Sequence, residues 1–266
     1  MMKRVKRLVL PLYLGFGLTY LFLPVMVVIL FSFNDNTSRF NVVWQGFTLK
    51  HWLNPFGVPE VPRALAISIA IAFLASGLAT ILGTLIALAL ARYQFKGRSA
   101  TNILLFFPMA TPEVVMGSSL LGLFVTNQIR TGFVTILLAH IVFILSYAVA
   151  TVRARIVGFD RHLEEAAMDL YANEWSTFRK VTLPMIMPGV FAAFLLGFAL
   201  SLDDFIVTNF TSGSLQTFPT YVWGAARRGI PGQVNVFGTG IFVLTVSLML
   251  LFLVIQKRRE GRPASS

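Results

Sequence analysis

Long apolar runs, separated by short polar segments, dominate the sequence. Six of these runs are long enough to cross a bilayer, because a transmembrane helix needs about 20 mostly apolar residues. They cover roughly residues 8–33, 64–91, 101–126, 133–157, 186–211 and 236–256. Each run is predicted to be a helix, since the hydrocarbon core offers no water to an open backbone. The pattern therefore predicts an all-α, polytopic membrane protein with six transmembrane helices in one membrane domain over residues 1–266.

The third run is interrupted by two prolines, Pro108 and Pro112. Proline removes a backbone hydrogen bond and clashes with the preceding turn, so a kink or break is expected. We expect Thr111 to cap a second half-helix that begins at Pro112 and holds Glu113 in its first turn. The Glu113 carboxylate then either stabilises the positive end of the helix dipole or binds a cation at a broken helix, as discontinuous helices do in transporters.

The fifth run carries two adjacent aspartates, Asp203 and Asp204. Each costs about 2.5–3.5 kcal/mol on membrane-insertion scales, so neither is expected to face lipid. In a continuous helix, Asp204 shares one polar stripe with Ser201, Thr208 and Thr211, whereas Asp203 lies on an apolar face. We predict that this stripe lines a water-filled substrate pathway and that Asp203 bonds a neighbouring helix or a partner subunit. The alternative is a structural polar network. Acids without intramembrane Lys or Arg nearby indicate a cationic substrate.

Composition and charge narrow the class of protein. Hydrophobic residues make up 56% of the chain and charged residues 12%, against about 25% charged in ordinary soluble domains. Threading six spans from a cytoplasmic N-terminus puts 16 of the 22 Lys and Arg on the cytoplasmic side. This bias predicts that both termini are cytoplasmic and that the net charge of +11 reflects topology rather than nucleic-acid binding. Without cysteine, disulfides and thiolate sites are excluded, and we predict neither a catalytic group nor a metal site.

One histidine and two tryptophans are further candidates for a functional or structural role. His140 stands alone in the apolar fourth run, where a packed or interhelical hydrogen-bonding residue is favoured over a ligand. Trp44 and Trp52 lie in the first external loop. They are either interfacial belt residues or contacts for an outside partner, and we include both among the candidate residues of the substrate pathway.

A polar segment over residues 158–185 separates the fourth and fifth runs. Its pattern predicts two short helices, the first capped by Asp160 and the second by Asn173, with Glu174 in its first turn. Arg161 and Glu165 stand at i and i+4 on one face. The segment also offers small or apolar residues to a partner groove, namely Ala166, Ala167, Leu170 and Phe178. A solvated amphipathic loop is the alternative.

Several segments resemble the signatures of one family of membrane proteins. These segments are Phe31-Ser32-Phe33-Asn34, Trp44-Gln45-Gly46-Phe47, Pro112-Glu113-Val114-Val115-Met116-Gly117, Glu164-Glu165-Ala166-Ala167-Met168-Asp169-Leu170, Val181-Thr182-Leu183-Pro184 and Leu200-Ser201-Leu202-Asp203-Asp204-Phe205. Together they resemble the type I permeases of ABC importers, and in particular the spermidine/putrescine (polyamine) subgroup.

The resemblance implies a multi-pass permease of the bacterial cytoplasmic (inner) membrane that works by alternating access. Its implied partners are a second permease, an extracytoplasmic substrate-binding protein and a cytoplasmic ATPase dimer that carries ATP and Mg. No phosphate-loop pattern occurs in this chain, so it is not expected to be an enzyme or to bind a cofactor directly. The implied ATPase-coupling residues are Glu164, Glu165, Ala166, Ala167, Asp169, Leu170, Tyr171, Ala172 and Glu174. The alternatives are a related importer for another small solute and a non-ABC channel or scaffold subunit.

The chain departs from the family pattern at Tyr171, where the family's loop usually has glycine. Glycine accepts a left-handed turn cheaply, whereas tyrosine does not. Asn173 tolerates that conformation better, so we predict that the turn moves toward residues 172–173.

Overall fold

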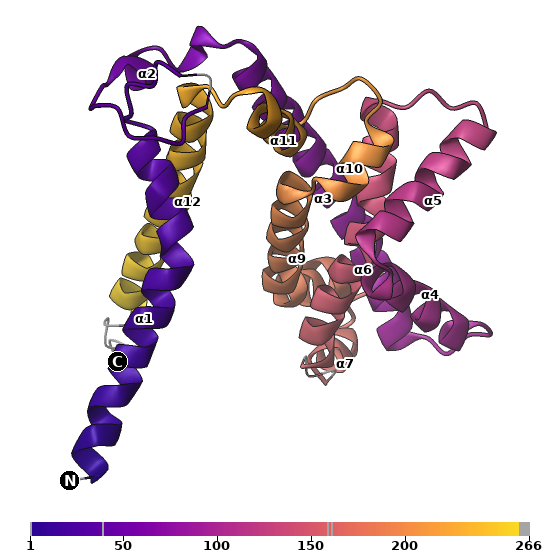
Figure 1. Cartoon of the computed structure of the whole chain (residues 1–266). Coiled ribbons are helices and arrows are strands. Elements are labelled where there is room, and N and C mark those ends of the chain that lie inside the picture. The colour runs from indigo at the N-terminus through magenta and orange to yellow at the C-terminus, as the bar shows by residue number, and fades with distance from the viewer. Residues whose placement is uncertain (1, 39, 159, 161, 261–266) are drawn as a thin grey trace. The chain divides into compact units, whose positions relative to one another are not determined.

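The computed structural model describes residues 2–38, 40–158, 160 and 162–260, and nearly all of its regular structure is helical (Figure 1). Within these residues, β-type pairing is limited to one isolated antiparallel bridge between Asn34 and Phe47. The helices are α1 (Met2–Phe31), α2 (Lys50–Leu53), η1 (Pro55–Gly57), α3 (Glu60–Arg92), α4 (Arg98–Ala110), α5 (Glu113–Thr126), α6 (Phe133–Val157), α7 (His162–Asp169), α8 (Glu174–Thr177), the π-helical η2 (Phe178–Thr182), α9 (Leu183–Asp203), α10 (Ile206–Thr211), α11 (Phe218–Arg228) and α12 (Gly232–Glu260).

Four helical stretches in the described residues are long and apolar enough to cross a membrane. They are Pro11–Phe31, Glu60–Arg92, Phe133–Val157 and Glu174–Asp203. A fifth arises if α4 and α5, bent by 108° at their junction, count as one broken span. The described apolar part of α12, Gly232–Ser247, falls at the position of the sixth predicted run.

The broken third run is confirmed, but its cap differs from the prediction. Thr111 ends α4 in an extended conformation and donates its hydroxyl to the Phe107 carbonyl at 2.7 Å. Pro112, rather than Thr111, directly precedes α5, whose first residue is Glu113. Pro108 is accommodated within α4, whereas Pro112 lacks a backbone donor and disfavours a helical conformation at Thr111, which is why the helix ends at this point.

The predicted fifth run is too long at its C-terminal end. α9 stops at Asp203, Asp204 is extended at φ −65° and ψ 119°, and a separate helix α10 begins at Ile206. The Asp204 carboxylate accepts hydrogen bonds from the backbone N–H groups of Val207 at 3.3 Å and Thr208 at 2.8 Å. Aspartate competes for backbone donors in this way and favours helix starts over helix interiors.

The chain divides into two compact units, residues 1–62 with 222–266 and residues 63–221. This division does not test the single membrane domain predicted above, which stays a prediction. In the first unit α1 packs against α12. The Phe22 and Phe242 rings lie 6.4 Å apart edge to face, and Val28 approaches Gly238, so the two helices run antiparallel. None of the apolar window within Pro11–Phe31 is buried in this chain.

The loop that follows α1 is held by a small polar core. Asn34 is fully buried and its amide donates to Asn41 Oδ1 at 2.6 Å and to the Val43 carbonyl at 2.8 Å. Its own oxygen accepts from the Gln45 N–H at 2.8 Å. The Phe33 ring stacks on Trp52 at 5.4 Å. These residues of the first-span signature therefore fold the loop after α1 back on its own helix.

In the second unit the long helix α6 packs against α3 and α9. One buried cluster joins the three helices through Ala87, Leu90, Ala148, Val149, Val152 and Ala193. Small residues let the backbones approach closely, as is usual between membrane helices. A Cβ added at Gly83 would lie 2.8 Å from Ala148, and one at Gly197 would lie 2.6 Å from Ile144.

Candidate functional site

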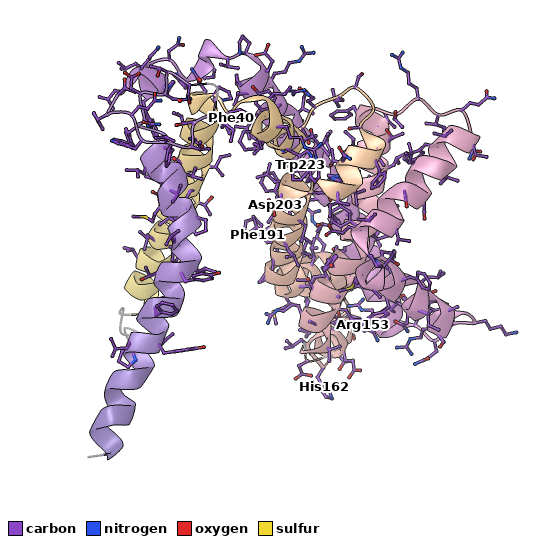
Figure 2. The ribbon with its side chains drawn as sticks, viewed as in Figure 1. Phe40, Arg153, His162, Phe191, Asp203 and Trp223 are labelled. Atoms are coloured by element: carbon purple, nitrogen blue, oxygen red, sulfur yellow. The ribbon has the colours of Figure 1, made fainter. Side chains whose placement is uncertain are left out.

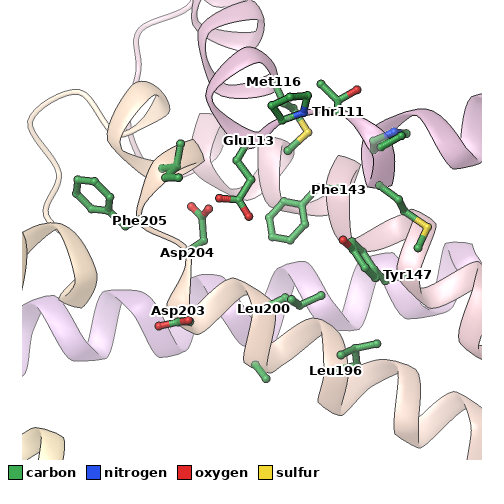
Figure 3. Close-up of a pocket in the computed structure, with 16 residues that line it drawn as sticks. Thr111, Glu113, Met116, Phe143, Tyr147, Leu196, Leu200, Asp203, Asp204 and Phe205 are labelled. Carbon is green, nitrogen blue, oxygen red and sulfur yellow. The ribbon is translucent and has the colours of Figure 1, made fainter. Parts of the chain in front are cut away.

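A cavity with a volume of about 820 Å³ lies in the second unit where α4 meets α5 and where α9 ends (Figure 3). Helix α6 closes it with Phe143 and Tyr147. The residues that line it are Pro108, Met109, Ala110, Thr111, Pro112, Glu113, Met116, Phe143, Tyr147, Leu196, Ala199, Leu200, Asp203, Asp204, Phe205 and Ile206. The predicted break between α4 and α5 and the unpredicted break between α9 and α10 thus border one hollow.

Three carboxylates line this cavity, from Glu113, Asp203 and Asp204. Figure 3 shows Glu113 and Asp204 pointing toward the same part of the cavity, while Asp203 points away from them. Glu113 and Asp203 are exposed, and no described residue donates a hydrogen bond to either carboxylate. None of the lining residues is Lys, Arg or His. The cavity wall therefore carries uncompensated negative charge that favours a cationic ligand.

Asp204 differs from the other two carboxylates because the protein itself bonds it. Its side chain is 6% exposed, and Oδ2 accepts from the Thr208 hydroxyl at 2.7 Å. His140 Nε2 lies 3.2 Å from the same oxygen. His140, 1% exposed, also lies 2.6 Å from Ser201 Oγ through Nδ1 and 3.0 Å from Thr208 Oγ1 through Nε2.

Donor counting fixes the tautomer of this histidine. The Thr208 hydroxyl has one proton and gives it to Asp204, so it can only accept from His140 Nε2. Nε2 therefore carries a proton, and a neutral ring then accepts the Ser201 hydroxyl at Nδ1. The four side chains form a satisfied network that ties α6 to α9 and α10, as an interhelical role for His140 predicts.

The predicted polar stripe is assembled, but not by a continuous helix. Ser201 lies on α9, Thr208 and Thr211 lie on α10, and all three are buried. Asp203 was expected to bond a neighbouring helix or a partner subunit; it lines the cavity and has no partner among the described residues, and the bond to a partner subunit stays a prediction. Trp44 is 43% exposed and Trp52 donates Nε1–H to Ser32 Oγ at 3.2 Å in the first unit. Neither tryptophan is among the lining residues.

The polar segment between α6 and α9 forms the two short helices that were predicted. The Asn173 side chain caps α8 by accepting from the Ser176 N–H at 2.8 Å, and Glu174 lies in the first turn. Asp160 Oδ1 accepts from the His162 N–H at 3.0 Å at the start of α7. The predicted pairing of Arg161 with Glu165 lies outside the described residues.

Glu164 is bonded within the chain. It is 8% exposed, and its carboxylate pairs with Arg92 at the end of α3 and accepts the hydroxyl of Thr182 in η2. Arg92 also lies 3.2 Å from Thr182 Oγ1. This triad fixes α7 to two membrane helices.

Most other predicted coupling residues lie at the surface. Glu165, Ala166, Asp169, Leu170, Tyr171 and Glu174 are exposed, and Ala167 and Ala172 are half-buried. Leu170 is 81% exposed and Tyr171 100% exposed, beside exposed Leu163, Met168 and Trp175. This apolar surface has no cover within the described residues.

The prediction for the turn after α7 is wrong, because Tyr171 itself has φ +62°. The Ala172 N–H bonds the Ala167 carbonyl at 3.1 Å and the Tyr171 N–H bonds the Met168 carbonyl at 2.9 Å. This pair of bonds is the Schellman motif with tyrosine at the position usually taken by glycine. The two hydrogen bonds offset the strain of a left-handed tyrosine.

Comparison with known proteins identifies the class to which this fold and this cavity belong. Residues 79–261 match the family described as "Binding-protein-dependent transport system inner membrane component". The chain belongs to this family of multi-pass inner-membrane permeases.

Its relatives are named as polyamine permeases. The chain is 38% identical over 242 residues to the Spermidine/putrescine transport system permease protein PotC of Haemophilus influenzae, covering 91% of this chain and 93% of the relative. It is 36% identical over 231 residues to the Putrescine transport system permease protein PotI of Escherichia coli K12, covering 84% and 82%.

Solved structures confirm the fold. A chain from a bacterial ABC transporter involved in the import of the acidic polysaccharide alginate superposes with a TM-score of 0.68 at 17% identity, covering 98% of this chain and 99% of that one. A chain of an amino acid ABC transporter gives a TM-score of 0.57 at 17% identity, covering 80% and 100%. The expected architecture of an ABC importer permease is therefore correct.

Proposed function

We propose that this chain is the permease subunit of an ATP-driven importer and carries polyamine-like cations, of the spermidine and putrescine type, by alternating access. The observation that carries the proposal is the charge on the wall of the cavity that Glu113, Asp203 and Asp204 line. Glu113 and Asp203 offer carboxylates that no described residue bonds, and no cationic side chain lines the wall. A linear polyamine presents several ammonium groups, each a donor for carboxylates. Phe143, Tyr147 and Phe205 add ring faces that attract cations.

The free carboxylates also change which residues we assign to the substrate. Thr208 and His140 both hold Oδ2 of Asp204. We therefore assign Asp204 mainly to shaping the cavity, and only its other oxygen, Oδ1, to contact with the transported cation. Asp203 and Glu113 are the primary ligands of the cation. An anionic solute would be repelled by this wall, and a neutral solute is the remaining alternative within the family.

The partners follow from two exposed surfaces. The apolar side chains around Leu170, Tyr171 and Trp175 fit the groove of a cytoplasmic ATPase. In this proposal that ATPase, and not this chain, binds ATP and Mg. The uncovered apolar face of α1 fits lipid or a second permease. The relatives' family is binding-protein-dependent, so we assign delivery of the cation to an extracytoplasmic binding protein.

The start of α1 and the end of α12 are placed in the cytoplasm in this proposal. Support comes from the positive-inside bias of the sequence and from the antiparallel packing of these two helices. Because the chain has no cysteine, single cysteines can be introduced at Lys96 and at Arg130 without background. A membrane-impermeant thiol reagent added to intact cells should label Arg130→Cys and spare Lys96→Cys; the opposite pattern would reverse the topology.

Uptake in a reconstituted system tests the substrate class. The permease, its partner permease and the ATPase are placed in proteoliposomes with the binding protein outside and ATP inside, and labelled spermidine or putrescine is supplied. We expect ATP-dependent uptake that unlabelled polyamines compete away and neutral diols of equal length do not. Equal competition by the diols, or no polyamine uptake by an assembly that hydrolyses ATP, would reject the proposal.

A further inference from the structure

A second, smaller cavity of about 200 Å³ lies at the opposite end of the second unit from Asp203. The ends of α3 and α6, the start of α4, and α7, η2 and α9 enclose it. Figure 2 shows Arg153 near His162 at this end and Asp203 toward the other. The charged residues that line the cavity are Arg92, Arg98, Arg153 and Glu164.

Glu164 neutralises one of the three arginines. Its carboxylate is paired with Arg92 and with the Thr182 hydroxyl. Arg98 and Arg153 have no carboxylate partner among the described residues. Two positive charges therefore remain on the wall of a small cavity.

The two remaining arginines are held in place by single neutral acceptors. Arg98 donates Nη2–H to the Leu90 carbonyl at 2.8 Å, and Arg153 donates Nη1–H to Asn102 Oδ1 at 2.8 Å. A guanidinium has five N–H donors, so most donors of both groups stay free. Arg98 Nε is buried and has no hydrogen-bond partner among the described residues. A buried donor without a partner is costly, and an anion in the cavity would supply one.

We propose that this cavity binds a phosphate group between Arg98 and Arg153. Guanidinium forks match the spaced oxygens of a tetrahedral oxyanion better than other side chains do. Arg98 is also the first residue of α4, whose first turn holds no acidic residue, and the positive helix end adds to the attraction. A water-sized molecule needs only about 10–15 Å³ of space for its centre, so the cavity has room for a phosphate and accompanying waters.

Two sources can supply this group, an anionic phospholipid headgroup or free phosphate. Basic pockets between the cytoplasmic ends of membrane helices commonly hold lipid headgroups. Whichever source supplies it, the phosphate ties the start of α4 to the end of α6 beside Glu164, which anchors α7. Occupancy therefore stabilises the segment that carries the apolar surface around Leu170.

Binding is tested on the complete transporter, purified in detergent and depleted of lipid. The apparent melting temperature is measured against dioctanoyl phosphatidylglycerol, with dioctanoyl phosphatidylcholine as the headgroup control. Sodium phosphate is compared with sodium chloride at equal ionic strength. If a lipid headgroup is the source, we expect the apparent melting temperature to rise saturably with phosphatidylglycerol and not with phosphatidylcholine. If free phosphate is the source, we expect the saturable rise with sodium phosphate. No saturable rise with either probe would overturn the proposal without reference to any variant.

Variants locate the effect. Arg153→Gln can still bond Asn102 but loses its charge, and we expect it to weaken binding about ten-fold or more, since a charged hydrogen bond is lost. Arg98→Gln should do the same. Lys96→Gln removes the same charge from an exposed residue that does not line the cavity, and we expect it to leave binding unchanged. An equal loss in Lys96→Gln, or undiminished binding in both arginine variants, would overturn the assignment.

Discussion

At the end of α9 the second unit holds a cavity lined by three carboxylates and no cationic side chain, whereas the cavity near the start of α9 is lined by three arginines and one carboxylate. In each cavity, internal bonds occupy part of the charged lining: one carboxylate in the acidic cavity, and one arginine with the carboxylate in the basic cavity. His140 and Thr208 bond Asp204 in the acidic cavity, and Arg92 bonds Glu164 in the basic one.

The comparison separates groups that hold the fold from groups that are free to bind. Asp204 and Glu164 each join several helices and are buried. Glu113 and Asp203, like Arg98 and Arg153, line their cavities without an opposite charge beside them. A charged residue near the membrane is therefore best assigned by counting its internal partners rather than by its residue type.

The largest effect is expected from breaking the network of the acidic cavity with His140→Phe. Ser201, Thr208 and Asp204 would each lose a buried partner, at about 1–3 kcal/mol for each group left unpaired. We expect a fall of many degrees in the apparent melting temperature of the purified transporter. The matched control is His51→Phe, because His51 is buried but its ring nitrogens have no partner in the described residues. A similar fall in melting temperature in both variants would show that the loss of a polar ring, and not of the hydrogen-bond network of His140, lowers the stability.

A smaller loss is expected in the basic cavity from Glu164→Gln. The amide can still accept from Thr182 but leaves Arg92 without its countercharge. Because Arg92 is 30% exposed, water screens part of the cost, which we place at about 1–2 kcal/mol. Glu165→Gln is the same change at the neighbouring exposed residue, and we expect less than about 0.5 kcal/mol. Thermal unfolding of both variants checks the difference. Equal losses of stability would contradict the claim that Glu164 stabilises the fold through Arg92.

A modest gain is expected at the turn that follows α7. Tyr171→Gly relieves a left-handed tyrosine, worth about 1–2 kcal/mol, but glycine loses about 0.5–1 kcal/mol of that through a more flexible unfolded chain. We expect slower amide hydrogen exchange at residue 172, whose N–H closes the turn. Leu170→Gly, at a residue without positive φ, should speed exchange instead. Faster exchange in Tyr171→Gly would contradict the strained turn.

The smallest effect is the pH dependence of the exposed pair before α7. Hydrogen bonding to Asp160, at 2.7 Å, raises the pKa of His162 above 6.5, while the His162 backbone N–H and side chain lower the pKa of Asp160 below 3.8. The His162 contribution is complete below pH 6.5 and disappears as pH rises through the raised pKa. The Asp160 contribution is complete above pH 3.8 and disappears as pH falls through the lowered one. The protection of the amides at the start of α7, that is, their exchange relative to the intrinsic rate at each pH, should be greatest between these limits. His162→Gln should flatten the alkaline side of this protection profile, and an unchanged profile in that variant would exclude the pair.

Sequence reasoning predicted the helical membrane architecture, the break in the third run and the caps of the coupling segment. These follow from local signals, namely long apolar runs, prolines and capping residues such as Asn173. The roles of the two aspartates could not be predicted, because the periodicity argument assumed that one helix continues through Asp204. Its side chain instead starts α10, so the helical periodicity on which the two roles were based does not hold there.

The partners of buried charges were also beyond the sequence. Arg92 and Glu164 lie 72 positions apart, and His140 and Ser201 lie 61 apart. No spacing rule connects residues on different helices. The one available signal was a lone histidine in an apolar run, which correctly indicated an interhelical hydrogen bond for His140. The strained Tyr171 was missed because the two hydrogen bonds of the turn outweighed its intrinsic preference.

The most direct test of the account is polyamine uptake by the double variant Asp203→Asn/Glu113→Gln in assembled proteoliposomes. Removing both free charges of the acidic cavity should lower uptake at limiting substrate at least about ten-fold, while assembly with the ATPase and basal hydrolysis persist. Asp35→Asn/Glu60→Gln makes the same two changes at exposed residues that do not line the cavity and should transport normally. Undiminished uptake by the double cavity variant would contradict the claim that these carboxylates bind the transported cation.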